Sequence, residues 1–290
     1  MIDGLLRGQR ADGGFGATPY SKWKGAHWRL VSLVELGVPK TDRRARAAAQ
    51  HALKWIANPQ HTAPTIKGLE RRHASIEGNA LAVACRLGFA GDRRARFLVD
   101  VLLRAQWPDG GWNCDRHLDA HRSSFHESLA PIWGLFEYHR ATGDDSALAA
   151  ANRAGELLLE HRIFRSLRTG EPINKEWLEI HWPHYWHYDF FHGLRAIAML
   201  GRLADPRAAD AVEHLLSLRR PDGTWHATGR RYWRLKGVAS IEVVDWGDAR
   251  QIVTPIARAL VLAKDSDPLA PKGRIATTNS VRLAPKVRNR

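Results

Sequence analysis

The sequence has little cysteine and no long apolar run. Only two cysteines, Cys85 and Cys114, occur in 290 residues, which excludes a disulfide framework and favours a reducing compartment such as the cytoplasm. No stretch of about eighteen apolar residues occurs and no charged-then-apolar leader opens the chain, so we expect neither a membrane span nor secretion. Peripheral contact with a membrane surface is compatible with this composition. The hydrophobic content of 44% suffices for a large core.

The charge balance is strongly basic, with a formal net charge of +14. Arginines cluster at 43–46 and 93–96, at the expected starts of helices, where the helix dipole disfavours positive charge. A nucleic-acid surface is one interpretation of this excess. A solvated outer face is the simpler one, and we expect no nucleic-acid partner.

The stretch 102–133 organises the rest of the chain. An amphipathic helix at 93–106 runs into the turn 108–111, where proline and two glycines end it. A second helix then begins, with Ser124 as its cap and Glu127 three residues later as a capping box. This second helix is apolar nearly all round, so we expect an outer helix followed by a buried inner one.

The turn recurs along the chain, which makes the repeat the first guide to the fold. Its copies lie at 8–16, 105–112 and 218–225. Extending the pattern predicts five pairs of helices that must stack side by side to bury their faces. The outer helices are expected at 2–8, 43–57, 93–106, 146–161 and 206–219. The inner helices are expected at 26–37, 74–89, 123–140, 186–203 and 247–264.

The pattern Gln-x-x-Asp-Gly-Gly-x-Trp after an apolar helix resembles the QW repeat of squalene-hopene and oxidosqualene cyclases and of protein prenyltransferase β subunits. The resemblance implies an all-α fold over residues 1–264, an α/α toroid of about five inner and outer helix pairs. It also implies that the Gln and aromatic positions of the repeat join neighbouring outer helices. These positions are Gln9, Phe15, Gln106, Trp112 and Trp225.

The sequence departs from both branches of this superfamily. The cyclases protonate their substrate with an Asp-x-Asp-Asp motif, and no such motif occurs here. The prenyltransferase β subunits bind zinc with Asp, Cys and His. Cys114 and Asp115, near His117, His121 and His126, offer these ligand types, but in a different order from the family's Asp-x-Cys. We therefore expect Cys114 to be a turn residue, and expect no metal and no cofactor.

Polar and aromatic residues cluster at the start of each expected inner helix. If the inner helices run in one direction, these clusters meet at one mouth of the toroid, where a substrate cavity is expected. The positive ends of the helix dipoles would lie there too. The candidate catalytic residues are His73, Glu77, Asp115, His126, Glu127, His187 and Asp189. The candidate substrate-binding residues are His27, Trp28, Trp133, Trp182, Tyr185, Trp186, Phe190, Asp245 and Trp246.

Roles follow from residue type and spacing. His73 and Glu77 stand four residues apart on one helix face and are predicted to touch as an acid–base pair. Asp115 and Asp189 are the candidates for a general acid whose pKa is raised beside aromatic walls. The aromatic residues would stabilise a carbocation by cation–π contact, and plain core packing is the alternative.

The leading functional hypothesis is acid-initiated cyclisation or isomerisation of an isoprenoid or other apolar small molecule. One alternative is a non-catalytic toroid that binds a lipid or a peptide. Another is a different toroid chemistry, either polysaccharide lysis or zinc-dependent prenyl transfer. Residues 265–290 read as a basic, disordered tail. Since closed toroids of this kind usually have six pairs, five pairs predict an open barrel or completion by a partner, such as a second copy in a homodimer.

Overall fold

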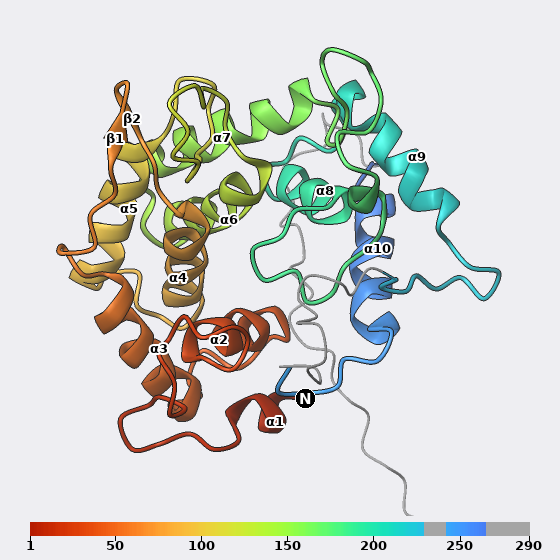
Figure 1. Cartoon of the computed structure of the whole chain (residues 1–290). Helices are drawn as coiled ribbons and strands as arrows, with labels where there is room; N and C mark the ends of the chain where they lie inside the picture. Colours follow the sequence, from red (N-terminus) through yellow and green to blue (C-terminus); the bar gives the residue numbers. More distant parts are fainter. Residues whose placement is uncertain (229–241, 265–290) are drawn as a thin grey trace, which may run out of the picture.

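The computed structural model describes residues 1–228 and 242–264, which are mostly helical (Figure 1). The expectation of an all-α chain is confirmed. A small antiparallel hairpin pairs β1 (Thr65–Ile66) with β2 (Leu69–Glu70). No helix within the described ranges is both long and apolar enough to cross a membrane. The predicted tail at 265–290 lies outside the described residues.

One set of helices is buried on most sides, because its residues are apolar nearly all round. These helices surround the middle of the molecule in Figure 1. They are α2 (Ala26–Glu35), α4 (Ala74–Arg86), α6 (Phe125–Thr142) and α8 (Phe190–Met199). The last long helix, α10 (Arg250–Lys264), buries only one face, through Val253, Thr254, Ala257 and Leu260. The predicted inner helices are therefore present, although α8 begins at Phe190 and not at 186.

The other set is amphipathic and forms the outside in Figure 1. It comprises α3 (Arg43–Ile56), α5 (Arg93–Ala105), α7 (Asp145–Glu160) and α9 (Ala209–Ser217). Asp42, Asp92 and Asp144 cap the first three by accepting hydrogen bonds from backbone amides of the first turn. The short elements are α1 (Ile2–Leu6), η1 (Lys175–Leu178) and η2 (Pro206–Ala208).

The arginines at the helix starts make specific structural contacts. Arg44 donates to the carbonyl of Leu6, and Arg46 donates to the carbonyl of Leu87. Arg94 binds the cap residue Asp92, with a shortest nitrogen–oxygen distance of 2.6 Å. These contacts join the outer helices to neighbouring segments and to their own caps. A structural role accounts for this part of the basic excess.

The three copies of the repeated turn adopt the same hydrogen-bond pattern. Around Gly110, the amide of Trp107 donates to the carbonyl of Gly111 at 2.8 Å, and the amide of Gly110 donates to the carbonyl of Trp107 at 2.9 Å. The Gln106 side chain donates to the carbonyl of Ala150, at 2.9 Å, and so binds the turn to α7. The equivalent pairs in the other turns are Arg10–Gly14, Gly13–Arg10, Arg220–Thr224 and Gly223–Arg220, and Gln9 binds the Arg44 carbonyl of α3.

Gly110→Ala is expected to lower the free energy of unfolding by about 2–4 kcal/mol. An added Cβ would lie 2.5 Å from the carbonyl oxygen of Arg153, in a backbone conformation with φ of +98°. Gly143→Ala is the matched control, because Gly143 also has positive φ but no atom lies within 4 Å of the added carbon. Its cost should be about 1 kcal/mol. Urea denaturation measures both, and equal losses would show that the close approach of α7 does not matter.

A close crossing of α4 and α6 brings their first turns together. A Cβ on Gly78 would lie 2.3 Å from the backbone nitrogen of Pro131, and one on Gly134 would lie 2.4 Å from the carbonyl oxygen of Gly78. Glycine at both positions therefore permits the two backbones to approach. As a result the amide of Ser75, in the first turn of α4, donates to the carboxylate of Glu127 in α6 at 2.9 Å.

Candidate functional site

The N-terminal ends of α4, α6 and α8 lie close together. Ser75 at the start of α4 binds Glu127 at the start of α6. The imidazole Nδ1 of His126 accepts a hydrogen bond from the amide of Tyr188, just before α8, at 2.8 Å. Residues from α4, α6 and the segment before α8 therefore share one region. We call it the N-terminal end of the buried helices.

Aromatic side chains fill much of this end. The Tyr185 ring stacks on Trp23 with centroids 4.0 Å apart and an interplanar angle of 4°. Trp28 meets Trp23 edge-on at 5.1 Å. Trp186 stacks on His187, also at 4.0 Å. Since Trp23, Trp28 and Tyr185 are buried, this cluster packs as a core between α2 and the segment before α8.

Asp189 does not fulfil the role predicted for it. Its carboxylate is fully buried and accepts hydrogen bonds from the amides of His181 and His192, both at 2.9 Å. It also contacts the Nδ1 atoms of both imidazoles, at 3.0 and 2.8 Å. Although burial opposes ionisation, His192 and His181 hold the pKa of Asp189 well below its usual value. The prediction of a raised-pKa general acid is therefore wrong for Asp189, which caps α8 as a carboxylate.

Asp115 also lies in surroundings other than those predicted. It is exposed and accepts a hydrogen bond from the amide of His117 at 2.9 Å, as a local turn. An exposed carboxylate in a turn is not enclosed by aromatic walls. The structure therefore removes the reason for assigning Asp115 as the general acid.

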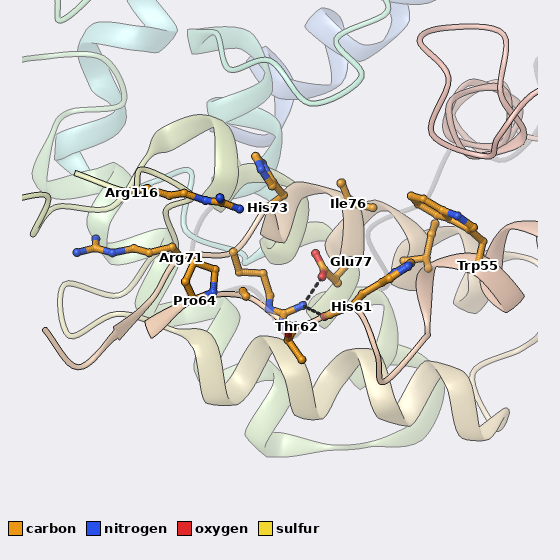
Figure 2. Close-up of a pocket in the computed structure, with 12 residues that line it drawn as sticks. Trp55, His61, Thr62, Pro64, Arg71, His73, Ile76, Glu77 and Arg116 are labelled. Carbon is orange, nitrogen blue, oxygen red and sulfur yellow. Dashed lines mark hydrogen bonds and ion pairs between the residues drawn. The ribbon is translucent and has the colours of Figure 1, made fainter. Parts of the chain in front are cut away.

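The predicted contact between His73 and Glu77 is replaced by two other pairs. Glu77 accepts a hydrogen bond from Arg72 at 2.8 Å, drawn in Figure 2, and burial raises the pKa of Glu77 despite this ion pair. His73 instead faces Glu127, with Nδ1 3.4 Å from Oε1. Figure 2 shows the imidazole of His73 on the side of the pocket away from Glu77. The acid–base pair at this helix start joins α4 to α6 and does not lie within α4.

His73, Cys114 and Glu127 converge, a grouping that sequence reasoning did not find. One donor atom from each lies within 4.8 Å of the other two. Two neighbours raise the pKa of His73 to about 10. The larger effect comes from the Cys114 thiol and the smaller one from the Glu127 carboxylate. Although burial opposes ionisation, His73 and the Ser75 amide lower the pKa of Glu127. The local field therefore favours a positive charge among these three groups.

The zinc ligands considered from sequence do not come together. His117 and His121 are exposed, and His121 contacts the carbonyl of Asp119 at 2.7 Å. His126 uses its Nδ1 to accept from Tyr188. Within 1–228 and 242–264, the grouping with spacing suited to a metal is the one that combines Cys114 with His73 and Glu127.

A cavity of about 620 Å³ opens at the opposite, C-terminal end of the buried helices. Its walls include apolar side chains of α6 and α10, among them Leu129, Trp133 and Leu260. His184 and His192 lie at its inner end, and burial lowers the pKa of both. The cavity is thus lined mainly by the C-terminal halves of these helices, and only His184 comes from the segment before α8 that also contributes to the N-terminal end.

The remaining predicted site residues are buried histidines, buried aromatic residues and one exposed aspartate. His27 is buried, and burial lowers its pKa to about 3. His187 is buried too. Its burial, and to a smaller extent repulsion from His126, lowers its pKa to about 2. Trp182, Phe190 and Trp246 are buried, and the Trp246 indole donates to Glu242 at 3.3 Å. Asp245 is exposed.

No protein family model, no curated protein and no solved structure matches this chain. The residues at the two ends of the buried helices are therefore the basis for the function proposed below.

Proposed function

We propose that this chain is an α/α toroid related to the squalene-hopene cyclases and the prenyltransferase β subunits. The support is the alternation of outer and buried helices, together with the repeated turn whose glutamines bind the next outer helix at Arg44 and Ala150. Assignment of residues 1–264 to one toroid, a cytoplasmic location and a homodimer belong to the same proposal.

The proposed function of the toroid is to bind an isoprenoid or a similarly apolar molecule in the cavity at the C-terminal end. The observation that carries this proposal is a volume of about 620 Å³ between buried helices with apolar walls. Ligand pockets commonly enclose about 300–1,000 Å³ and are mostly apolar with a few placed polar groups. Trp133 and Phe136 supply aromatic faces on the α6 side of the cavity.

The charged groups at the cavity favour binding over acid catalysis. Glu35 is paired with Arg195 at 2.7 Å, and Glu137 is paired with Arg86 at 3.3 Å. Both carboxylates at the cavity are therefore bound by arginine side chains. Acid-initiated cyclisation stays a prediction from the sequence. The ion pairs favour the second candidate function, a toroid that binds an apolar molecule without transforming it.

Filling the cavity is expected to weaken ligand binding strongly. Ala259 on α10 lines the cavity and is exposed, so Ala259→Trp should place an indole in the cavity without disturbing the core. We expect geranylgeraniol to bind the wild-type chain, and expect this variant to weaken binding about tenfold or more. Native mass spectrometry of the protein incubated with geranylgeraniol measures the bound fraction.

Ala149→Trp is the matched control, because Ala149 is an exposed alanine of α7 that does not line the cavity. It should bind like the wild type. Maltohexaose tests the polysaccharide alternative in the same assay. Undiminished binding by Ala259→Trp, or binding of maltohexaose in place of geranylgeraniol, would contradict the proposal.

A further inference from the structure

The donor atoms of His73, Cys114 and Glu127 are arranged around a common point. All three lie within 4.8 Å of one another, and the Nδ1–Oε1 distance between His73 and Glu127 is 3.4 Å. Ligands bound to tetrahedral zinc at bond lengths of about 2.0–2.3 Å are separated by roughly 3.3–3.8 Å. We propose that His73, Cys114 and Glu127 form a Zn²⁺ site at the N-terminal end of the buried helices. This inference does not depend on the binding of an apolar molecule at the other end.

The same three residue types could also form a nucleophilic triad, and the geometry argues against it. In a triad the thiol and the carboxylate bind opposite nitrogens of the imidazole, which separates sulfur from carboxylate oxygen by roughly 7 Å. Here the Cys114 sulfur and a Glu127 oxygen are no more than 4.8 Å apart. The two acidic groups therefore face the same point and not the two edges of the His73 ring.

Two hydrogen bonds from backbone amides hold the segments that carry the three donors together before any ion binds. The amide of Arg72 donates to the carbonyl of Asn113 at 3.0 Å, which joins the residues next to His73 and Cys114. The amide of Ser75 fixes the second carboxylate oxygen of Glu127 at 2.9 Å. Such outer contacts orient metal ligands and increase affinity.

The donor set matches zinc, and its exposure leaves room for a fourth ligand. Thiolate, imidazole and carboxylate are the three donor types that Zn²⁺ takes in proteins, and three protein ligands with one open position are typical of catalytic sites. The His73 side chain is 60% exposed, whereas that of Glu127 is 6% exposed. His73 also lines, with Arg116, the cavity of about 150 Å³ in Figure 2. A water molecule or a small anion beside Arg116 would complete the coordination.

Metal binding by the full chain tests this site. Titration with Co²⁺ should produce a thiolate-to-cobalt absorption band in the near ultraviolet, and Zn²⁺ should displace the cobalt at about one ion per chain. Cys114→Ala should remove the band and weaken Co²⁺ binding by about 100-fold or more. His73→Gln should weaken it similarly, and because His73 is largely exposed this variant should fold.

Cys85→Ala is the matched control. It removes the other thiol of the chain, which is buried in α4, and should keep the cobalt band. Circular dichroism verifies that each variant is folded. Folded wild-type protein without the band, or a band that persists in Cys114→Ala, would overturn the assignment.

Discussion

Asp189→Asn is expected to destabilise the protein by about 3–5 kcal/mol, since it disrupts a fully buried network of hydrogen bonds to a carboxylate. The carboxylate accepts from two imidazoles and two amides, all between 2.8 and 3.0 Å. An asparagine of nearly the same size keeps one acceptor oxygen. Its NH₂ group replaces the other oxygen and faces an amide and an imidazole that need an acceptor. Urea denaturation at neutral pH measures the loss.

Asp248→Asn is the matched control for this substitution. Asp248 also contacts an imidazole, that of His226 at 2.9 Å, and accepts from the amide of Arg250, but its side chain is 49% exposed. Exposed pairs contribute about 0.2–1 kcal/mol, so the control should change little. Similar losses in both variants would show that burial of Asp189 is not what makes its contacts strong.

Stability is expected to fall as the pH decreases from about 6.5 towards 3. Burial lowers the pKa of His27 to about 3 and that of His187 to about 2, whereas an unfolded histidine titrates near 6.5. Below pH 6.5 these histidines bind protons in the unfolded chain but not in the folded chain. Proton binding therefore stabilises the unfolded state and lowers the free energy of unfolding. For His27 alone the loss by pH 3 is on the order of 4 kcal/mol. Asp189, with its lowered pKa, acts in the same direction at still lower pH.

His27→Leu isolates this contribution. The Nε2 atom of His27 is buried and has no hydrogen-bond partner among the described residues, so an apolar replacement should cost little at neutral pH. The urea midpoint of the variant should fall less steeply between pH 6.5 and 3 than that of the wild type. Parallel pH profiles would show that His27 is not the group responsible.

Most of the fold was predictable because the two kinds of helix have different sequence patterns. Outer helices such as α3 and α5 combine an aspartate cap with apolar residues on one face, and buried helices such as α6 are apolar nearly all round. The start of α8 was placed too early. Trp186 continues the apolar pattern, but the Asp189 side chain caps the helix and defines its first turn.

The candidate site was predictable only in part. That His126, Tyr185 and His187 lie at one end followed from the direction of the buried helices. The convergence on Cys114 did not, because it depends on hydrogen bonds between segments far apart in sequence, such as that from Arg72 to Asn113. The charge state of Asp189 was mispredicted for a related reason. Burial alone would raise its pKa, and the two histidines that reverse the effect were not foreseen as its partners.

The third repeated turn is packed less tightly than the other two. At Gly13 and Gly110 an added carbon would strike the backbone of the next outer helix, at 2.3 and 2.5 Å. At Gly223 the nearest atoms belong to the flexible side chains of Arg219 and Arg258. No outer helix follows this turn among the described residues, so a glutamine at 219 would have no carbonyl there to bind. The arginine at position 219 is compatible with this environment, because the hydrogen bond that Gln9 and Gln106 make to an outer helix has no acceptor here among the described residues.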